Sequence, residues 1–300
     1  MTENSMISRR IRQIGVNAVR LTAILLLVGS SAVQAQSSGA DHALKIVVNP
    51  ADGRYTIALP ESNSPALRAG VGAEVDGRWL HAADYPKHVV EHSQARGYLG
   101  EATDWQVTYT GLSGQPDLIY HLRAYSGEPF GDIQVTVLNT TGKAIHVESI
   151  RSLDATEGSI IDLGGPVLEN RILSDSFSED RPGIVIRDFA NAEQQMHRAV
   201  GSQLIYNRKS RESLFLGALT SERFLTILRL HLASSGDAVH PVAYEVDSTG
   251  TTELEKENSL GHSSAEDQVE LSLPVAPGAE LSSERVLFSL NTDYHRQLET

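Results

Sequence analysis

The segment 170–182 (NRILSDSFSEDRP) brings carboxylates, arginines and hydroxyls together within thirteen residues. Its candidate site residues are Ser174, Asp175, Ser176, Glu179, Asp180 and Arg181. Hydrolysis of a glycosidic bond needs two carboxyl groups about 5–10 Å apart, and Asp175 with Glu179 or Asp180 could meet that spacing on a loop. The same residues read equally as a solvated salt-bridge cluster, which adds little stability. Since functional side chains concentrate on loops held by rigid scaffolds, we treat this segment as the candidate site and assign it no catalytic residue.

Other chemistries find weaker support in the residue pattern. His88-Val-Val-Glu-His92 matches the His-x-x-Glu-His order of one class of zinc enzymes. That motif works on a helix, whereas Pro86 and strand-like runs surround it here. Gly111-Leu-Ser-Gly114 is not the Gly-x-Ser-x-Gly elbow of serine hydrolases, and no glycine-rich phosphate loop occurs. The chain has no cysteine, which excludes disulfides, thiolate zinc sites and cysteine nucleophiles. We therefore predict no metal and no cofactor.

Two tryptophans and several histidines could contact a sugar. Trp79 and Trp105 could stack on a sugar ring, but Trp is more often largely buried. Trp105 begins a strand-like run with Val107 on its own face, so we predict Trp105 in the core. His121 and His231 lie in strand-like runs and are candidates for the proton transfer that a sugar isomerase needs, although no motif selects them.

The rest of the chain must supply the scaffold, and it reads as a succession of strands. Runs 43–48 and 54–59 flank Asn49-Pro-Ala-Asp-Gly53, whose Pro and Asp-Gly provide turn geometry and predict a hairpin. Apolar and polar residues alternate in 118–124 and in 132–137, which is typical of half-buried antiparallel strands. These runs position side chains on two distinct faces of a sheet.

The strand count decides the fold class. The run 224–232 is almost continuously apolar, as in a strand buried on both faces, while 190–199 reads as a short helix or a loop. About fifteen such runs and no long helix indicate a sandwich or a barrel. So many strands must split into two packed sheets. We predict an all-β fold, a large two-sheet antiparallel β-supersandwich, over residues 43–290.

The N-terminus has the pattern of a secretory leader. Arginines precede the apolar run 21–28, and small residues then lead to a small-x-Ala cleavage site after Ala35. The apolar run is shorter than the about 20 residues that a membrane span needs. We predict a signal peptide over 1–35, a flexible lead-in over 36–42, and a periplasmic or secreted product that has no membrane contact after cleavage. An uncleaved anchor is the alternative.

The charge balance limits the class of partner. The formal net charge is −13, which is the wrong sign for a phosphate backbone, so we predict no nucleic-acid partner. With 40% hydrophobic and 21% charged residues, the composition is that of an ordinary folded domain. An acidic surface does not repel a neutral sugar, so the net charge does not exclude a sugar ligand.

Further runs follow the candidate segment in a characteristic order: 196–208 (MHRAVGSQLIYNR), 213–221 (SLFLGALTS) and the apolar strand that ends at Leu232. Together with 170–182, this order resembles the N-terminal β-sandwich of α-galactosidase and raffinose-synthase type glycoside hydrolases, over about residues 43–295. The resemblance implies a galactose-mutarotase-like topology in front of a catalytic (β/α)₈ barrel. The family's catalytic aspartates lie in that barrel, and no residue of this chain matches their motifs.

The resemblance therefore implies a non-catalytic N-terminal domain of an exported glycoside hydrolase that acts on α-galactosides. Residues 291–300 would begin the linker to a missing domain, and the chain would be a fragment of a longer enzyme. Such a domain packs on the barrel, and the resemblance makes loop 174–181 its barrel-docking or carbohydrate-edge loop. The expected partners are a carbohydrate and the barrel. Three alternatives stay open: a stand-alone carbohydrate-binding module, a mutarotase-type isomerase and a purely structural domain.

Overall fold

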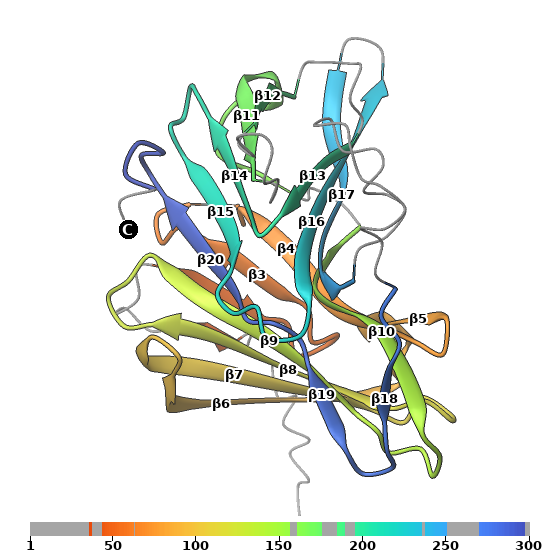
Figure 1. The fold of residues 1–300 in the computed structure, drawn as a ribbon. Helices are drawn as coiled ribbons and strands as arrows, with labels where there is room; N and C mark the ends of the chain where they lie inside the picture. Colours follow the sequence, from red (N-terminus) through yellow and green to blue (C-terminus); the bar gives the residue numbers. More distant parts are fainter. Residues whose placement is uncertain are drawn as a thin grey trace, which may run out of the picture. The chain divides into compact units, whose positions relative to one another are not determined.

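The computed structural model of the chain describes residues 36–37, 44–62, 64–156, 161–175, 185–189, 196–235, 238–250 and 270–297. Within these residues, two antiparallel sheets of ten strands each form the molecule (Figure 1). The first sheet runs in the order β1-β2-β3-β4-β10-β17-β16-β13, with β5 paired to β4 and β18 paired to β10. The second runs β12-β11-β14-β15-β20-β9-β8-β7-β6, with β19 paired to β9. The predicted two-sheet antiparallel supersandwich is confirmed.

Eight of the twenty described strands have nine to twelve residues, and the others are shorter. The first sheet contains β1 Gln36–Ser37, β2 Lys45–Val48, β3 Tyr55–Ala58, β4 Leu67–Val75, β5 Arg78–His81, β10 Ile145–Ala155, β13 Met196–Val200, β16 Leu225–Ser235, β17 Ala238–Thr249 and β18 Leu273–Val275. The second contains β6 Lys87–Gly97, β7 Gly100–Thr110, β8 Asp117–Tyr125, β9 Phe130–Leu138, β11 Asn170–Ser174, β12 Val185–Asp188, β14 Ser202–Asn207, β15 Ser213–Ala218, β19 Glu280–Ser282 and β20 Val286–Asn291. Two 3₁₀ turns, η1 Ala82–Asp84 and η2 Val167–Glu169, are the described helical elements.

Side chains from both sheets form one buried apolar cluster. Tyr55 of β3 and Tyr120 of β8 meet edge to face across it, with ring centroids 5.8 Å apart. Both hydroxyls are satisfied, because Tyr55 donates to the carbonyl of Ser152 (3.0 Å) and Tyr120 to that of Gly53 (2.6 Å). Trp105 is 1% exposed, which confirms its predicted place in the core.

The hairpin predicted around residues 49–53 is also confirmed. Strands β2 and β3 pair, with Val48 opposite Tyr55. The turn closes through the N–H of Gly53, which donates to the carbonyl of Asn49 (2.7 Å). Gly53 has φ +69°, and a Cβ there would collide with the Tyr109 hydroxyl, so this position requires glycine on both counts.

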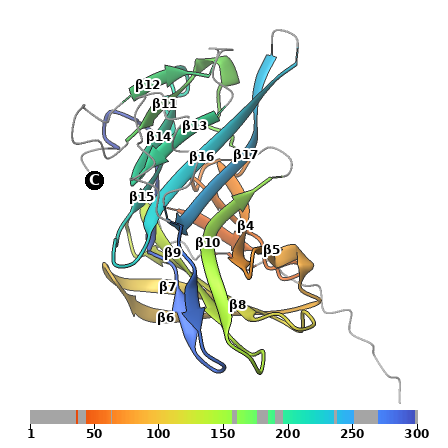
Figure 2. The ribbon, with the colours of Figure 1, turned by 45° about the vertical axis from the view of Figure 1, so that its right-hand side comes forward.

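Strand β16 is buried on both faces, as the apolar run predicted, but its second face is polar. Leu228 and Leu230 point into the core, whereas Arg229 and His231 point to the opposite side of the sheet. Figure 2 shows β16 and β17 as a long hairpin beside β10. In the segment expected to be a helix or loop, residues 196–200 form strand β13; residues 190–195 lie outside the described residues.

The chain continues to pack on the second sheet after β20. Gln297 is buried, accepts a hydrogen bond from Ser213 Oγ (3.0 Å) and donates one to Ser289 Oγ (2.9 Å). Part of the segment expected to begin a linker is therefore held by the sheet. Among the described residues, no helix has the length and apolar character required to cross a bilayer.

Candidate functional site

The candidate segment 170–182 begins with strand β11 of the second sheet, and the residue after this strand links the two sheets. Ser174 ends strand β11, and its Oγ accepts a hydrogen bond from Gln203 Nε2 (2.9 Å). The N–H of Asp175 donates to the carbonyl of Ser202 in the second sheet (3.0 Å), and the Asp175 carbonyl accepts from the N–H of Val200 in the first (2.8 Å). The remaining candidate residues lie outside the described residues: Ser176, Glu179, Asp180 and Arg181. The docking role of this loop therefore stays a prediction.

A buried group of charged side chains lies on the face of the first sheet that points away from the core. Along β17, Tyr244 and Val246 face the core, while Glu245 and Asp247 face the other way. The same alternation turns Arg229 of β16 outward. We call the group on this face the ion-pair cluster; it consists of His81, Arg151, Asp154, Arg229, His231, Glu245 and Asp247.

Asp247 is the centre of the ion-pair cluster. It accepts hydrogen bonds from Arg151 Nε (2.7 Å) and Nη2 (3.1 Å), and from Arg229 Nη1 (2.7 Å). It is 2% exposed. Burial raises the pKa of Asp247 above its usual range, and the two guanidinium groups offset this only in part. Buried charges need such partners, so these arginines neutralise Asp247.

Glu245 extends the ion-pair cluster toward β16. Its Oε1 accepts a hydrogen bond from Arg151 Nη1 (2.6 Å), and its Oε2 lies 3.6 Å from His231 Nε2. Partial burial acts to raise the pKa of Glu245, but the contacts with His231, Arg151 and Arg229 outweigh it and lower the pKa. Glu245 is therefore a carboxylate that stays ionised, not a proton donor.

Two glycines in β4 allow the ion-pair cluster to span that strand. Gly72 lies opposite His81 on one side and Arg151 on the other, and Gly70 lies opposite Asp154. Because neither glycine has a side chain, His81 Nδ1 reaches Asp154 Oδ2 across β4, at 2.7 Å. A Cβ at Gly72 would stand 2.9 Å from the Leu80 carbonyl oxygen and 3.8 Å from His81 Nδ1. The hydrogen bond to Asp154 raises the pKa of His81, so this pair favours the protonated imidazole.

Trp79 is covered by residues of the ion-pair cluster. The Arg151 guanidinium carbon lies 4.1 Å from the Trp79 ring centroid, within the range of a cation–π contact. The His81 ring is stacked nearby, at 6.1 Å and an interplanar angle of 22°. The ring expected to be able to stack on a sugar is therefore already used by the protein's own side chains.

The two histidines considered for proton transfer lie on different sheets. His231 belongs to β16 in the first sheet, while His121 belongs to β8 in the second, with its Nδ1 2.8 Å from Asp104 Oδ2. The pair that sequence reasoning missed is His81 with Asp154. The glycines at alternate positions 70 and 72 were the available signal, because they mark a strand crossed by its neighbours' side chains.

The His-x-x-Glu-His stretch lies in strand β6, as the surrounding pattern predicted. His88 and His92 pair with Tyr109 and Trp105, respectively, on the adjacent strand. Four residues of strand separate their Cα atoms by about 13 Å, too far for the compact arrangement that the motif has on a helix. His88 Nε2 instead lies 2.8 Å from the carbonyl oxygen of Pro50. Among the described residues, no group of three or more His, Asp or Glu side chains is placed to hold a metal ion.

Comparison with known proteins supports the fold. No protein-family model matches the sequence, and no curated protein matches it. The α-galactosidase from Lactobacillus brevis aligns with 89% of this chain and 41% of its own, at a TM-score of 0.56 and 8% identity. The α-N-acetylgalactosaminidase NagBb from Bifidobacterium bifidum, solved with GalNAc, aligns with 86% of this chain and 36% of its own, at 0.53 and 7% identity.

A third solved structure is aligned over almost its whole length. A galactose mutarotase related enzyme from Lactobacillus acidophilus aligns with 87% of this chain and 99% of its own, at a TM-score of 0.48 and 8% identity. This chain spans about two fifths of the length of the first two enzymes. The resemblance to a sandwich domain of α-galactosidase-type enzymes is confirmed at the level of the fold.

Proposed function

We propose that the chain is the non-catalytic sandwich domain of an exported glycoside hydrolase that acts on α-galactosides. It would pack on a (β/α)₈ barrel and help to shape the substrate site through loop 174–181. The observation that carries the proposal is the fold shared over 89% of this chain with 41% of an α-galactosidase. A domain of this size inside a longer enzyme leaves room for a separate catalytic unit.

The chemistry of the ion-pair cluster supports a non-catalytic role. A glycosidase needs one carboxyl group that stays protonated and reaches the leaving group. Asp247 has a raised pKa but is 2% exposed and accepts three hydrogen bonds from Arg151 and Arg229. Glu245 is more accessible, but its pKa is lowered. Neither carboxyl combines access with a retained proton.

The native polypeptide provides the test. An antibody raised against this chain should detect, in its source cells, a species well above 32.6 kDa, or a species that copurifies with α-galactosidase activity. The purified chain alone should not hydrolyse an aryl α-galactoside. Hydrolysis by the chain alone, abolished in Asp175→Asn and retained in a control Asp52→Asn, would overturn the proposal.

Export is a separate element of the proposal. The leader pattern over 1–35 places cleavage after Ala35. N-terminal sequencing of the periplasmic or secreted protein should begin at Gln36. A mature protein that begins at Met1 would contradict it.

A mutarotase-type isomerase is the second candidate, favoured by one observation. His81 lies beside Asp154, its pKa is raised, and its side chain is 40% exposed, so it is able to exchange a proton with a bound sugar. Polarimetry of α-galactose would detect accelerated anomerisation that His81→Gln removes and the control His121→Gln does not. A chain that binds galacto-oligosaccharides without accelerating anomerisation would instead be a carbohydrate-binding module.

A further inference from the structure

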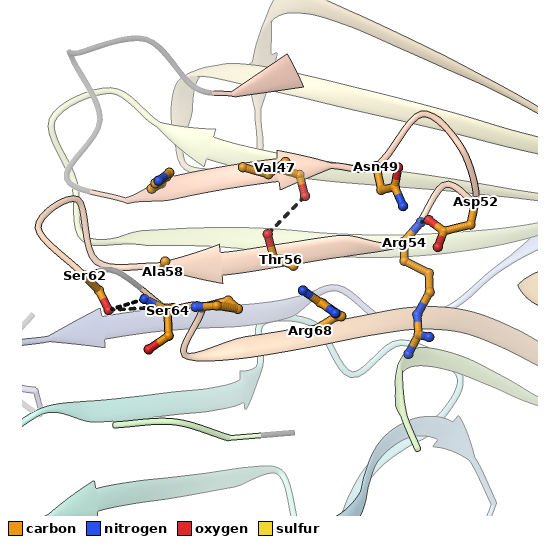
Figure 3. A pocket seen from close by; sticks show the side chains of 11 residues that line it. Val47, Asn49, Asp52, Arg54, Thr56, Ala58, Ser62, Ser64 and Arg68 are labelled. Atoms are coloured by element: carbon orange, nitrogen blue, oxygen red, sulfur yellow. Dashed lines mark hydrogen bonds between the residues drawn. The ribbon is translucent and has the colours of Figure 1, made fainter. Parts of the chain in front are cut away.

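A second group of basic side chains lies on the same outer face of the first sheet, over β2, β3 and β4. It lines a pocket of about 380 Å³. We call this the basic pocket; the lining residues that matter to its chemistry are Lys45, Asn49, Arg54, Thr56, Ser62 and Arg68. Figure 3 shows the pocket, with Asn49, Thr56 and Arg68 among the labelled side chains that line it. The volume falls within the range of about 300–1,000 Å³ usual for small-molecule sites.

The strand register brings the two exposed cations of the pocket within reach of one ligand. Lys45 of β2 lies opposite Ala58 of β3, and Thr56 of β3 lies opposite Arg68 of β4. Lys45 and Arg68 are therefore about 10 Å apart across the sheet and about 7 Å apart along it. Both side chains are long and flexible enough to meet over Thr56. An anionic group seated between them would contact both.

Two cations of the basic pocket, Lys45 and Arg68, form no ion pair with a described carboxylate. Both side chains are exposed. Asp52 is the carboxylate in the lining, and its Oδ1 accepts the backbone N–H of Arg54 (3.0 Å). The lining therefore presents two exposed cations beside one carboxylate, in a protein whose formal net charge is −13.

The neutral polar groups of the pocket suit the hydroxyls of a sugar. Asn49 Oδ1 accepts the N–H of Ala51 (3.0 Å), which leaves the amide Nδ2 as a donor. Thr56 Oγ1 donates to the carbonyl of Val47 (3.4 Å), and Ser62 Oγ donates to that of Ser64 (2.7 Å). Each hydroxyl oxygen keeps acceptor capacity for a ligand O–H. Ser64, beside them, donates to Asp162 Oδ2 (2.7 Å), so a second carboxylate lies behind the hydroxyl side of the pocket.

We propose that the basic pocket binds a saccharide that carries an oxyanion group, either a sulfate ester or a uronate carboxylate. Lys45 and Arg68 hold the oxyanion, while Asn49, Thr56 and Ser62 bind ring hydroxyls. No aromatic side chain lines the pocket, so binding is polar and electrostatic and weakens as salt screens the charges. The inference rests on the proposed function only for the choice of a sugar as ligand.

Isothermal titration of the purified chain provides the test. The probes are a sulfated galacto-oligosaccharide, a galacturonate oligomer, the neutral galacto-oligosaccharide of equal length and inorganic sulfate. At low ionic strength, at least one of the two anionic saccharides should bind saturably and more tightly than the neutral one, and the probe that binds identifies the oxyanion. Each cation should contribute roughly 3–10-fold in affinity.

The matched variants are Lys45→Gln with Arg68→Gln, and as a control Arg78→Gln with Lys87→Gln, which removes the same charge from exposed positions outside the pocket. The first pair should lose about tenfold or more in affinity, whereas the control should stay within about twofold. No saturable binding, equal binding of the neutral sugar, binding of sulfate alone, or equal loss in the control would overturn the proposal. A barrel-containing native enzyme with no such binding would overturn this inference while leaving the proposed function intact.

Discussion

Two groups of basic side chains on one face of one sheet have opposite arrangements. In the ion-pair cluster, Arg151 and Arg229 are buried and hydrogen-bonded to Asp247. In the basic pocket, Lys45 and Arg68 are exposed and form no ion pair with a described carboxylate. A buried charge must be matched inside the protein, whereas an exposed one can stay open to a ligand. The contrast separates residues that hold the sheet together from residues placed for binding.

The largest expected effect comes from breaking the ion-pair cluster. Asp247→Asn removes the charge that two buried guanidinium groups share, and it should lower the free energy of unfolding by about 3–5 kcal/mol. Asp52→Asn in the exposed basic pocket is the control and should change it by less than about 0.5 kcal/mol. Urea denaturation measures both. Equal effects of the two substitutions would remove the distinction between the regions.

A smaller loss should follow acidification, through a buried histidine that forms no ion pair among the described residues. His197 is 2% exposed and stacks on Phe189, and burial, aided by the charge of Arg187, lowers its pKa from 6.5 to about 4. The folded protein therefore favours the neutral imidazole over the protonated one, and protonation of His197 lowers the free energy of unfolding. That stability is fully present above the unfolded pKa of 6.5 and falls as pH drops toward 4. The loss amounts to about 3 kcal/mol.

Denaturation across this pH range tests the role of His197. The variant His197→Gln cannot titrate, so its stability should depend less on pH between 6.5 and 4 than that of the wild type. An unchanged slope in His197→Gln would show that another group causes the acid sensitivity.

His81 should respond to pH in the opposite direction and more weakly. Its pKa is raised, chiefly by the hydrogen bond to Asp154, so its contribution is fully present below the unfolded pKa of 6.5 and is lost as pH rises through the folded pKa. NMR titration should find a midpoint above 6.5 that Asp154→Asn moves down. A His81 midpoint that Asp154→Asn leaves unchanged would contradict the pairing.

The smallest effect on stability should come from the basic pocket itself. Lys45→Gln with Arg68→Gln removes two exposed charges that form no ion pair among the described residues, so the free energy of unfolding should change by less than about 0.5 kcal/mol. The same variant should lose anion binding, as described above. Thermal and urea denaturation beside the titration would separate the two effects. A large loss of stability would place these residues in the same class as Arg151.

The sequence predicts local features of this molecule well and distant ones poorly. Alternation identified the central strands, and the Pro and Asp-Gly of residues 49–53 identified a hairpin, because both signals lie within a few adjacent residues. The ion-pair cluster was missed because Arg151 and Asp247 stand 96 residues apart and meet only through the pairing of β10 with β17. Arg229 was hidden inside an apolar run. For loop 174–181, the sequence shows several charged residues close together in the chain, but it does not show how their side chains are arranged.

Strand β10 also determines when the first sheet can form. Its neighbours β4 and β17 come from opposite ends of the domain, and β18, at residues 273–275, pairs with it as well. Almost the whole domain must therefore be synthesised before β10 can pair with all its neighbours. Sheets closed by such distant segments fold slowly. A nascent chain would therefore lack a complete first sheet until residues 273–275 have left the ribosome. During that interval it would be in the unfolded state that the export proposed above requires.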